Sequence, residues 1–179
     1  MSIQVFILCK LIEGNNYPYK LKKLLSHPIP FDEFGGLTES KLYYHFDSLA
    51  KHGFIETVEV IKEDHRPDKQ VFGITNKGRE ELPKKIYKLF ENAVSISDML
   101  VGLAYIKHVD RDQVVKILEK NLKEFMTRRE YILDFEKQIR KDQVKENFLN
   151  YLQGYYSSKS EHTIYWLEEL IKQIQEKKI

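Results

Sequence analysis

The sequence predicts a mainly α-helical protein with one small β-hairpin, organised as a compact N-terminal domain and a helical C-terminal domain. Three observations lead to this prediction. Apolar residues recur at helical spacing in the segment 38–55, two strand-like runs with a charged segment between them follow it, and the C-terminal part reads as two long helices. A chain of 179 residues is long enough for one domain with an extension or for two small domains.

The first part of the chain predicts two short helices joined by a turn. Residues 2–13 are apolar on most sides of a helix, which Gly14 and two asparagines end. A second helix begins near Pro18, a residue suited to a first helical turn. Cys9 is the only cysteine, so it forms no intramolecular disulfide, and its apolar neighbours predict a small buried thiol. The segment 27–36 predicts a loop whose apolar residues pack on the core; they are Ile29, Phe31 and Phe34.

The segment 38–55 predicts a third helix, around which the rest of the domain is organised. Leu42, Phe46 and Leu49 fall at positions i, i+4 and i+7, which places them on one buried stripe, and Gly53 suits the helix end. Such a helix suits insertion into a DNA major groove, and an ordinary amphipathic surface helix is the alternative. The opposite face carries polar side chains and one aromatic ring, namely Glu39, Ser40, Lys41, Tyr44, His45 and Ser48.

A β-hairpin is predicted directly after this helix. Residues 55–61 and 70–74 are strand-like and bracket a charged insert with Pro67 at its tip. A hairpin in this place is a wing, whose basic side chains can approach phosphates; they are Lys62, His65, Arg66 and Lys69. A solvated hairpin tip is the alternative, and Asp64 and Asp68 weaken the basic character.

The remaining chain predicts helices. One opens after the N-cap residue Thr75, and Pro83 is expected to kink it or divide it. A further apolar helix follows in residues 95–108, before long helices over 109–141 and 144–179. The apolar seam of these two helices is too wide for them to bury against each other, which predicts a symmetric dimer.

Composition and motifs exclude several classes of protein. The net charge is only +2 although 31% of the residues are charged, so DNA binding would depend on local placement of basic residues. No Gly-rich phosphate loop, HExxH, CxxC or GxSxG motif occurs, which predicts no enzyme, no metal site and no cofactor. The apolar runs are too short to cross a membrane and no secretory signal pattern is present, which predicts a cytoplasmic protein.

The predicted order of elements is that of a winged helix-turn-helix, and the residues resemble the PadR family of transcriptional regulators. The segment FILCKLIEGNNYPYKLKKLL is similar to the first two helices of that family, which carry a Gly-containing turn and a Tyr. SKLYYHFDSLAKHGFI resembles the family's G-T-L-Y-P-x-L-x-x-L-x-x-x-G-L-I, and VFGITNKGREEL resembles Y-x-L-T-x-x-G-x-x-x-L. The two long helices, with TIYWLEELI near the end, are similar to the longer, AphA-like members.

Some residues depart from the family pattern. Ser40, Lys41 and Tyr44 stand where the family often has Gly, Thr and Pro, and only Arg66-Pro67 remains of the common basic run in the wing. These departures leave the expected fold intact, and they leave the operator sequence and the contribution of the wing open.

The resemblance implies both a division into domains and a function. Residues 1–82 would form a winged helix-turn-helix DNA-binding domain, and residues 83–179 an α-helical dimerisation domain. A homodimer, usually a repressor, would bind a palindromic operator in double-stranded DNA with its two reading heads one helical turn apart. Many relatives are released from DNA by a small, often aromatic molecule.

These expectations assign roles to named residues. The predicted DNA-binding residues, most of them contacting phosphates, are Thr38, Ser40, Lys41, Tyr44, His45, Arg66, Lys69, Lys22 and Lys23. The predicted effector site is lined by Trp166, Tyr165, Tyr155 and Phe125, for which a place in the dimer core is the alternative. A winged-helix module that binds a protein and not DNA is the competing function, and the near-neutral charge is its best support. The operator, the regulated genes, the effector and the direction of regulation stay open.

Overall fold

The computed structural model describes residues 2–34, 38–62, 68–139 and 146–179, which divide into two compact units, residues 1–110 and 111–179. The sequence placed a domain boundary after residue 82, whereas Leu82 is buried inside the helix α5 (Asn76–Glu91). The first unit extends to residue 110 because the segment after α5 packs back onto α5 and onto the first helix of the chain.

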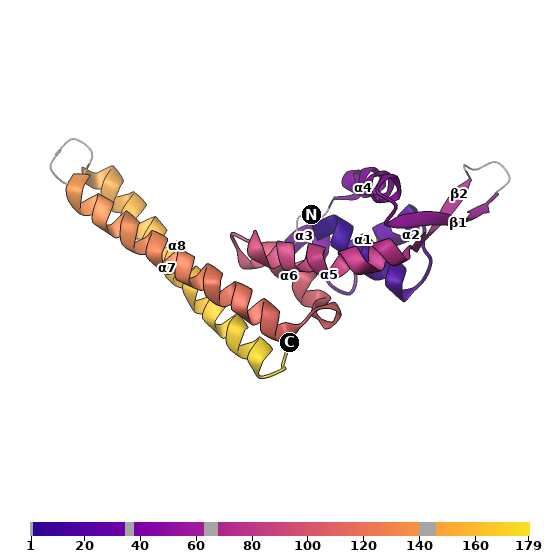
Figure 1. The fold of residues 1–179 in the computed structure, drawn as a ribbon. Helices are drawn as coiled ribbons and strands as arrows, with labels where there is room; N and C mark the ends of the chain where they lie inside the picture. Colours follow the sequence, from indigo (N-terminus) through magenta and orange to yellow (C-terminus); the bar gives the residue numbers. More distant parts are fainter. Residues whose placement is uncertain (1, 35–37, 63–67, 140–145) are drawn as a thin grey trace. The chain divides into compact units, whose positions relative to one another are not determined.

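The helix α1 (Ser2–Glu13) lies at the centre of the first unit (Figure 1). Its side chains are buried around most of its circumference, as expected of a helix that is apolar on nearly every side; they are Ile3, Val5, Phe6, Ile7, Leu8, Cys9 and Leu11. The prediction for Cys9 is confirmed, since the thiol is fully buried and this burial raises its pKa to about 12. The thiol is therefore protonated at neutral pH and serves as a packing group.

Two short helices follow α1. Pro18 begins α2 (Pro18–Lys23), as predicted from its suitability for a first helical turn. The segment predicted to be a loop contains the short helix α3 (Phe31–Phe34). Phe31 is buried there and its ring lies 5.8 Å from that of Phe6, edge to face. Ile29 and Phe34 are exposed, so the prediction that all three apolar residues of this loop enter the core was wrong for two of them.

The helix α4 (Glu39–Lys51) is the predicted third helix. Its stripe of Leu42, Phe46 and Leu49 is fully buried, which confirms the helical spacing read from the sequence. Gly53 follows with φ of 72°, a conformation that suits glycine and ends the helix. The buried stripe packs on α1 and α2, so the opposite face of α4 points into solvent.

The strands β1 (Ile55–Ile61) and β2 (Lys69–Ile74) form an antiparallel hairpin with an irregular register between Thr57 and Glu59. Most of β1 is exposed, whereas the middle of β2 is buried. Asn16 exchanges two backbone hydrogen bonds with Phe72, at 3.0 and 2.8 Å, so β2 is also fixed to the turn before α2. The hairpin is therefore anchored at its base while its other end extends away from the helices (Figure 1).

The helix α5 begins at the predicted cap, where the Thr75 hydroxyl accepts a hydrogen bond from the Gly78 amide at 3.1 Å. It continues through Pro83, so of the two alternatives predicted at this proline, a kink or a division, the division was wrong. The lost backbone hydrogen bond is offset by burial of four apolar residues on both sides of the proline: Leu82, Ile86, Leu89 and Phe90.

The helix α6 (Ile96–Ala104) and the 3-10 turn η1 (Ile106–His108) complete the first unit. A capping box starts α6, in which the Asp98 carboxylate accepts from the Ser95 amide at 2.9 Å. Met99 and Val101 bury α6 against its neighbours, so the core of the first unit is shared by α1, α5 and α6.

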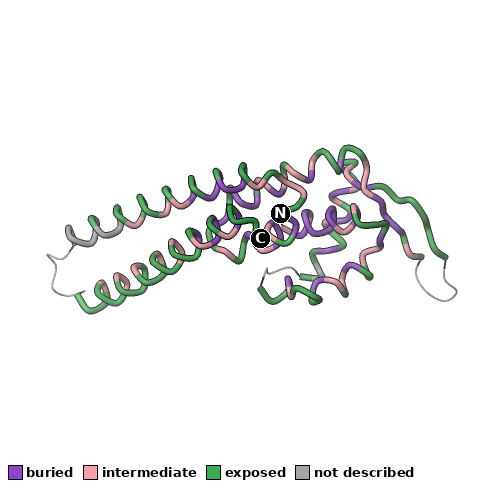
Figure 2. The backbone as a smooth tube through the Cα atoms, turned by 90° about the horizontal axis from the view of Figure 1, so that it is seen from below, coloured by how far each residue is buried: buried purple, intermediate pink, exposed green. Residues whose placement is uncertain are grey.

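The second unit is an antiparallel pair of long helices, α7 (Arg111–Ile139) and α8 (Glu146–Gln175). They run side by side in both views (Figures 1 and 2). Buried positions gather in one half of the pair (Figure 2), and the buried residues include Val114 and Leu118 of α7 and Leu167 and Ile171 of α8. The guanidinium of Arg111 donates to the backbone carbonyl of Ile179 at 3.1 Å and closes this end.

An ion pair joins the two helices farther along. Arg129, which interrupts the apolar seam in the sequence, donates to the Glu161 carboxylate at 2.7 Å. An exposed pair of this kind contributes about 0–1 kcal/mol, so it aligns the helices more than it stabilises them. The described fold is a winged helix-turn-helix followed by a pair of C-terminal helices, which confirms the predicted fold class.

Candidate nucleic-acid interface

The solvent face of α4 is an exposed polar surface of the winged helix. Successive residues turn by about 100° around a helix, so Tyr44 and Lys51 lie opposite the buried stripe. Tyr44 is 69% exposed, and Lys41 and Lys51 are also exposed. Lys41 and Tyr44 were predicted to read DNA; Lys51 was not, although it lies seven residues after Tyr44 on the same face. An aromatic ring and two ammonium groups therefore share an open helical surface.

His45 lies at the border of this face rather than on it. Its Nδ1 lies 3.4 Å from the Gln4 side-chain nitrogen, and the Lys85 ammonium donates to the Gln4 oxygen at 3.0 Å. Burial lowers the pKa of His45, and the positive charges of the chain N-terminus, Lys41 and Lys85 act in the same direction. The imidazole is thereby drawn into a network with α1 and α5, and its predicted contact with a base stays a prediction.

The N-terminus of α4 carries two more predicted contacts. Thr38 is exposed and occupies the N-cap in an extended conformation, without a side-chain capping hydrogen bond. Ser40 lies in the first turn, where free backbone amides attract phosphate oxygens. Its side chain lies outside the described part of the structure.

Further basic residues come from α2 and from the hairpin. Lys23 is exposed, with its Nζ 5.2 Å from the centre of the Tyr19 ring, and Lys22 is half-buried on the same helix. Lys69 begins β2, and its Nζ lies 5.7 Å from the centre of the Tyr17 ring. Each pairing leaves an ammonium group beside a flat aromatic surface. Arg66, the remaining wing residue, lies outside the described residues.

The first unit has equal numbers of basic and acidic residues, so it presents no excess of positive charge. Any attraction to phosphates would therefore have to come from a local group of basic residues, such as the lysines of α2 and α4, and this role stays a prediction. Because α2 packs directly on α4, these lysines lie on adjacent elements. The lysines of α2 and α4 could contact a nucleic-acid backbone, although the same elements also carry the acidic residue Asp47.

A crevice of about 390 Å³ opens between α2, α4 and β2. It is lined by Tyr17, Pro18, Tyr19, Tyr43, Phe46, Asp47, Asp68, Lys69, Gln70 and Phe72. Of these, only Lys69 was predicted to be a site residue. The sequence could have indicated one wall of the crevice, because Tyr43 and Asp47 are four residues apart on one flank of the predicted helix. Nothing in the sequence indicated that Tyr17 and Gln70 lie opposite that flank.

The four residues predicted to line an effector site lie in the second unit, and none of them borders this crevice. Tyr155, Tyr165 and Trp166 are each about half exposed on α8, and Phe125 is half-buried on α7. The rings of Tyr165 and Trp166 meet edge to face with centres 5.3 Å apart. Among the four residues, only this contact between Tyr165 and Trp166 is observed, and the role of all four stays a prediction.

The comparison with protein families decides the assignment of the first unit. Residues 7–84 match the model of the transcriptional regulator PadR-like family. The chain carries a PadR-like domain. The match runs from α1 into α5 and includes α2, α4 and the hairpin, so all three elements of the candidate interface belong to the PadR-like domain. The family consists of transcriptional regulators and not of enzymes, and membership in a longer subgroup stays a prediction.

Several solved structures are similar to the whole chain or to its PadR-like domain. Bacillus subtilis PadR in complex with operator DNA is 18% identical, covers 97% of this chain and 99% of its own, and has a TM-score of 0.45. A PadR-like regulator from Bacillus cereus is 22% identical, with 97% and 96% covered and a TM-score of 0.42. A regulator from Clostridium thermocellum is 29% identical, with 48% and 78% covered and a TM-score of 0.40. No curated protein matches the sequence.

Two further features of the described ranges bear on other classes of function. None of the described helices combines the length and the apolar character needed to cross a membrane. Within the same residues, no group of three or more His, Cys, Asp or Glu side chains is placed to hold a metal ion.

Proposed function

We propose that this protein is a homodimeric, sequence-specific DNA-binding transcriptional regulator, with repression released by a small-molecule effector as the mode of action. The observation that carries the proposal is the geometry of α4 in the PadR-like domain. Its apolar stripe is fully buried, and its opposite face presents Lys41, Tyr44 and Lys51 to solvent. A helix held in this way can enter a major groove without exposing its own core.

In the proposed complex, Lys41 and Tyr44 face the groove from the N-terminal half of α4. The Lys41 ammonium can contact guanine or phosphate, and Tyr44 can contact a phosphate or a thymine methyl group. Thr38 and Ser40 lie at the helix start, where the backbone amides favour a phosphate. Few of these contacts distinguish bases, so the operator is selected by a small number of side chains.

Contacts outside α4 would position the domain along the duplex. In this proposal Lys22 and Lys23 of α2 would hold the flanking backbone, and Lys69 and Arg66 would be the wing contacts. Lysine contacts to phosphate release counterions, so affinity is expected to fall steeply as salt rises. The equal numbers of basic and acidic residues in the first unit make this local group decisive.

The proposed dimer is supported by aromatic residues that the single chain leaves in solvent on α8. Tyr151 is 71% exposed and Phe148 is 60% exposed, and Tyr155, Tyr156, Tyr165 and Trp166 are also exposed. Aromatic residues are enriched in the centres of protein interfaces. A symmetric pair of second units would cover them and set the distance between two PadR-like domains, which a palindromic operator requires.

The proposed effector site is lined by Tyr155, Tyr165, Trp166 and Phe125. Stacking on these rings suits a small aromatic or phenolic molecule, and an effector bound between dimer helices would change the spacing of the reading heads. The alternative place for the same rings is the core of the dimer.

The test is a titration of the full chain against the duplex upstream of its own gene, with an unrelated duplex as competitor, at two salt concentrations. Tight binding that resists the competitor and weakens with salt is the expected result. Equal affinity for both duplexes would overturn sequence-specific recognition of that operator. Binding to neither duplex would overturn DNA binding and favour a protein-binding module, the function that the neutral charge of the first unit supports.

A further inference from the structure

The crevice between α2, α4 and β2 has the composition of a ligand site. We name it the aromatic crevice, and it is formed by the ten residues given above. Phe46 and Phe72 form its buried floor, with ring centres 5.1 Å apart. Tyr19 and Tyr43 are each about half exposed at its rim. A volume of about 390 Å³ lies at the lower end of the range of small-molecule pockets, which suits a ligand of one or two rings.

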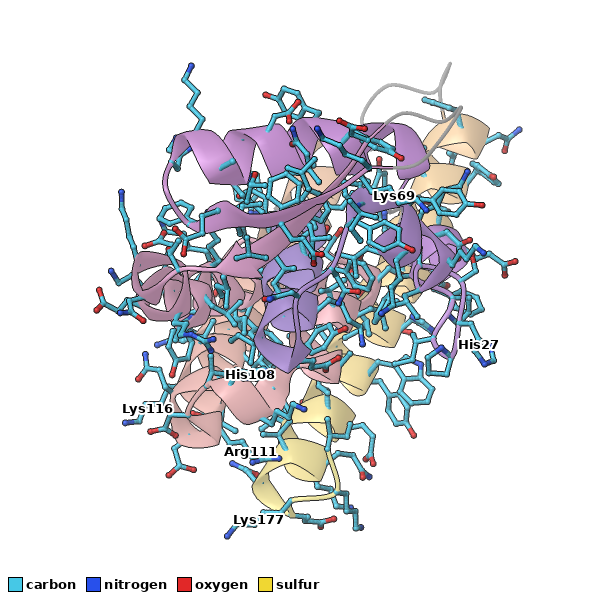
Figure 3. All side chains as sticks on the ribbon, turned by 90° about the vertical axis from the view of Figure 1, so that its right-hand side faces the viewer. His27, Lys69, His108, Arg111, Lys116 and Lys177 are labelled. Carbon is cyan, nitrogen blue, oxygen red and sulfur yellow. The ribbon has the colours of Figure 1, made fainter. Side chains whose placement is uncertain are left out.

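The charged residues of the aromatic crevice indicate whether its ligand is positively or negatively charged. Asp47 comes from α4 and Asp68 from the residue before β2, and Lys69 is the single basic residue. The ammonium of Lys69, which is labelled in Figure 3, already lies over the Tyr17 ring, 5.7 Å from the ring centre. The lining therefore carries one more carboxylate than ammonium group. This excess of negative charge disfavours binding of an anionic ligand such as a phosphate or a carboxylate.

Aromatic faces add to this preference. The rings of Tyr17, Tyr19, Tyr43, Phe46 and Phe72 present negative π-surfaces, which attract cations held within about 6 Å of the ring centre. Lys69 over Tyr17 is an internal example of the same interaction. A ligand with a flat apolar ring and a positive charge satisfies both the rings and the two carboxylates.

We infer that the aromatic crevice binds a small aromatic organic cation. This site is separate from the effector site proposed on α7 and α8, since the crevice lies wholly within the PadR-like domain. Its walls are α2, α4 and β2, so a bound cation would fill the space between the reading helix and the wing and weaken binding to DNA. This regulatory consequence depends on the proposed function, whereas the binding of the cation does not.

The experiment uses benzyltrimethylammonium chloride as the probe and isothermal titration calorimetry of the full chain without DNA. The expected result is saturable binding of the cation at one site per chain, with at least fivefold weaker binding of benzoate. Asp47→Asn removes one carboxylate from an exposed position of α4 and is expected to weaken cation binding about fivefold. Tyr43→Leu removes one ring and is expected to have a similar effect.

Glu59→Gln is the matched control, because it removes an equal charge from an exposed position of β1 outside the crevice. Its affinity for the cation should equal that of the wild type. Circular dichroism of each variant verifies that the helices are intact. Binding of benzoate as tight as that of the cation, no binding of the cation, or equal loss in Glu59→Gln and Asp47→Asn would each overturn the inference.

A second arm separates this inference from the proposed function. Duplex affinity is measured first without the cation and then with saturating cation, at constant ionic strength set with sodium chloride. At least threefold weaker duplex binding is expected, and unchanged affinity with the cation bound would overturn the regulatory consequence. If the chain binds no duplex in the first step, the proposed function fails, and the calorimetry alone decides whether the crevice binds cations.

Discussion

The two units of the chain bury their apolar residues in different ways. In the first unit α1 is enclosed by four neighbouring elements, and Phe6, Phe46 and Phe90 are almost fully buried. In the second unit the buried positions of the two helices gather in one half of the pair (Figure 2), and large aromatic residues of α8 are exposed, among them Phe148, Tyr151 and Tyr165. The first unit can thus be stable by its own core, whereas the second leaves apolar surface for a partner.

This difference distinguishes residues that stabilise the fold from exposed residues that are available to bind a partner. Packing in the core is sufficient to explain the role of a deeply buried residue of the first unit. An exposed aromatic residue of α8 has no such explanation, because exposed apolar groups in a contiguous patch indicate binding. Substitutions in the two units should therefore affect different measurements, which leads to the following predictions.

The largest difference in stability is expected between two glycine-to-alanine variants, one in each unit. A Cβ at Gly78 would lie 2.0 Å from the backbone oxygen of Phe54, so Gly78→Ala forces the start of α5 away from the α4–β1 junction. We expect a loss of more than about 2 kcal/mol in the free energy of unfolding. At Gly154, in α8, a Cβ meets no atom within 4 Å, and Gly154→Ala should stabilise the protein by about 0.5–1 kcal/mol.

Urea unfolding followed by circular dichroism measures both glycine variants on the full chain. Gly154→Ala serves as the control, since it adds the same methyl group within a helix. If Gly78→Ala unfolds at the same urea concentration as the wild type, the close approach of α5 to Phe54 is contradicted.

Association of the chain should depend on the exposed rings of the second unit. The double variant Tyr165→Ala and Trp166→Ala removes two neighbouring rings, and we expect the dimer dissociation constant to rise at least about tenfold. Tyr44→Ala removes an equally exposed ring from α4 and should leave the constant unchanged. Sedimentation equilibrium gives the dissociation constants. An unchanged constant in the double variant would remove these rings from the dimer interface.

DNA binding should depend on the first unit in a position-specific way. Lys41→Ala removes an exposed ammonium from the first turns of α4, and we expect a loss of more than about 1 kcal/mol in binding to the operator. Lys116→Ala removes an exposed ammonium from α7 (Figure 3) and should have little effect. Fluorescence anisotropy at matched salt compares the variants, and equal affinities would place Lys41 outside the interface.

Much of the first unit could be predicted from the sequence because its elements follow local rules. The stripe of α4 follows from helical spacing, the end of that helix from Gly53, and the start of α5 from the Thr75 cap. The family resemblance read from the motifs agrees with the match over residues 7–84. These features require only residues that are near each other in the chain.

The errors arose where distant contacts decide the outcome. Pro83 stays inside α5 because residues on both sides are buried against other helices, a gain that local propensity does not include. The position of His45 depends on Gln4, 41 residues earlier, and the aromatic crevice depends on three separate segments. A list of polar residues on one helix cannot reveal such partners, and a helical turn of about 100° per residue already places His45 near the buried stripe.

The smallest expected effect is a decrease in the free energy of unfolding in mild acid. We attribute this decrease to two histidines of the first unit. Burial lowers the pKa of both His45 and His108, and nearby lysines lower it further. The unfolded chain therefore binds protons at a higher pH than the folded chain does. Stability from these neutral imidazoles is fully present above the ordinary histidine pKa of about 6.5, and it is lost as the pH falls toward the lowered values.

Both His45 and His108 should contribute to the loss of stability in acid. Protonation of His45 at Nδ1 removes the acceptor that faces Gln4, and protonation of His108 adds charge to a ring whose Nε2 is buried without a hydrogen-bond partner in the described structure. We expect the melting temperature to fall less between pH 7.5 and about pH 5.5 in His45→Gln than in the wild type, and least in the double variant with His108→Gln. Differential scanning calorimetry at constant ionic strength measures this difference. If the double variant and the wild type lose stability equally, acid acts through carboxylates or the second unit, and the burial of these imidazoles does not limit the stability of the first.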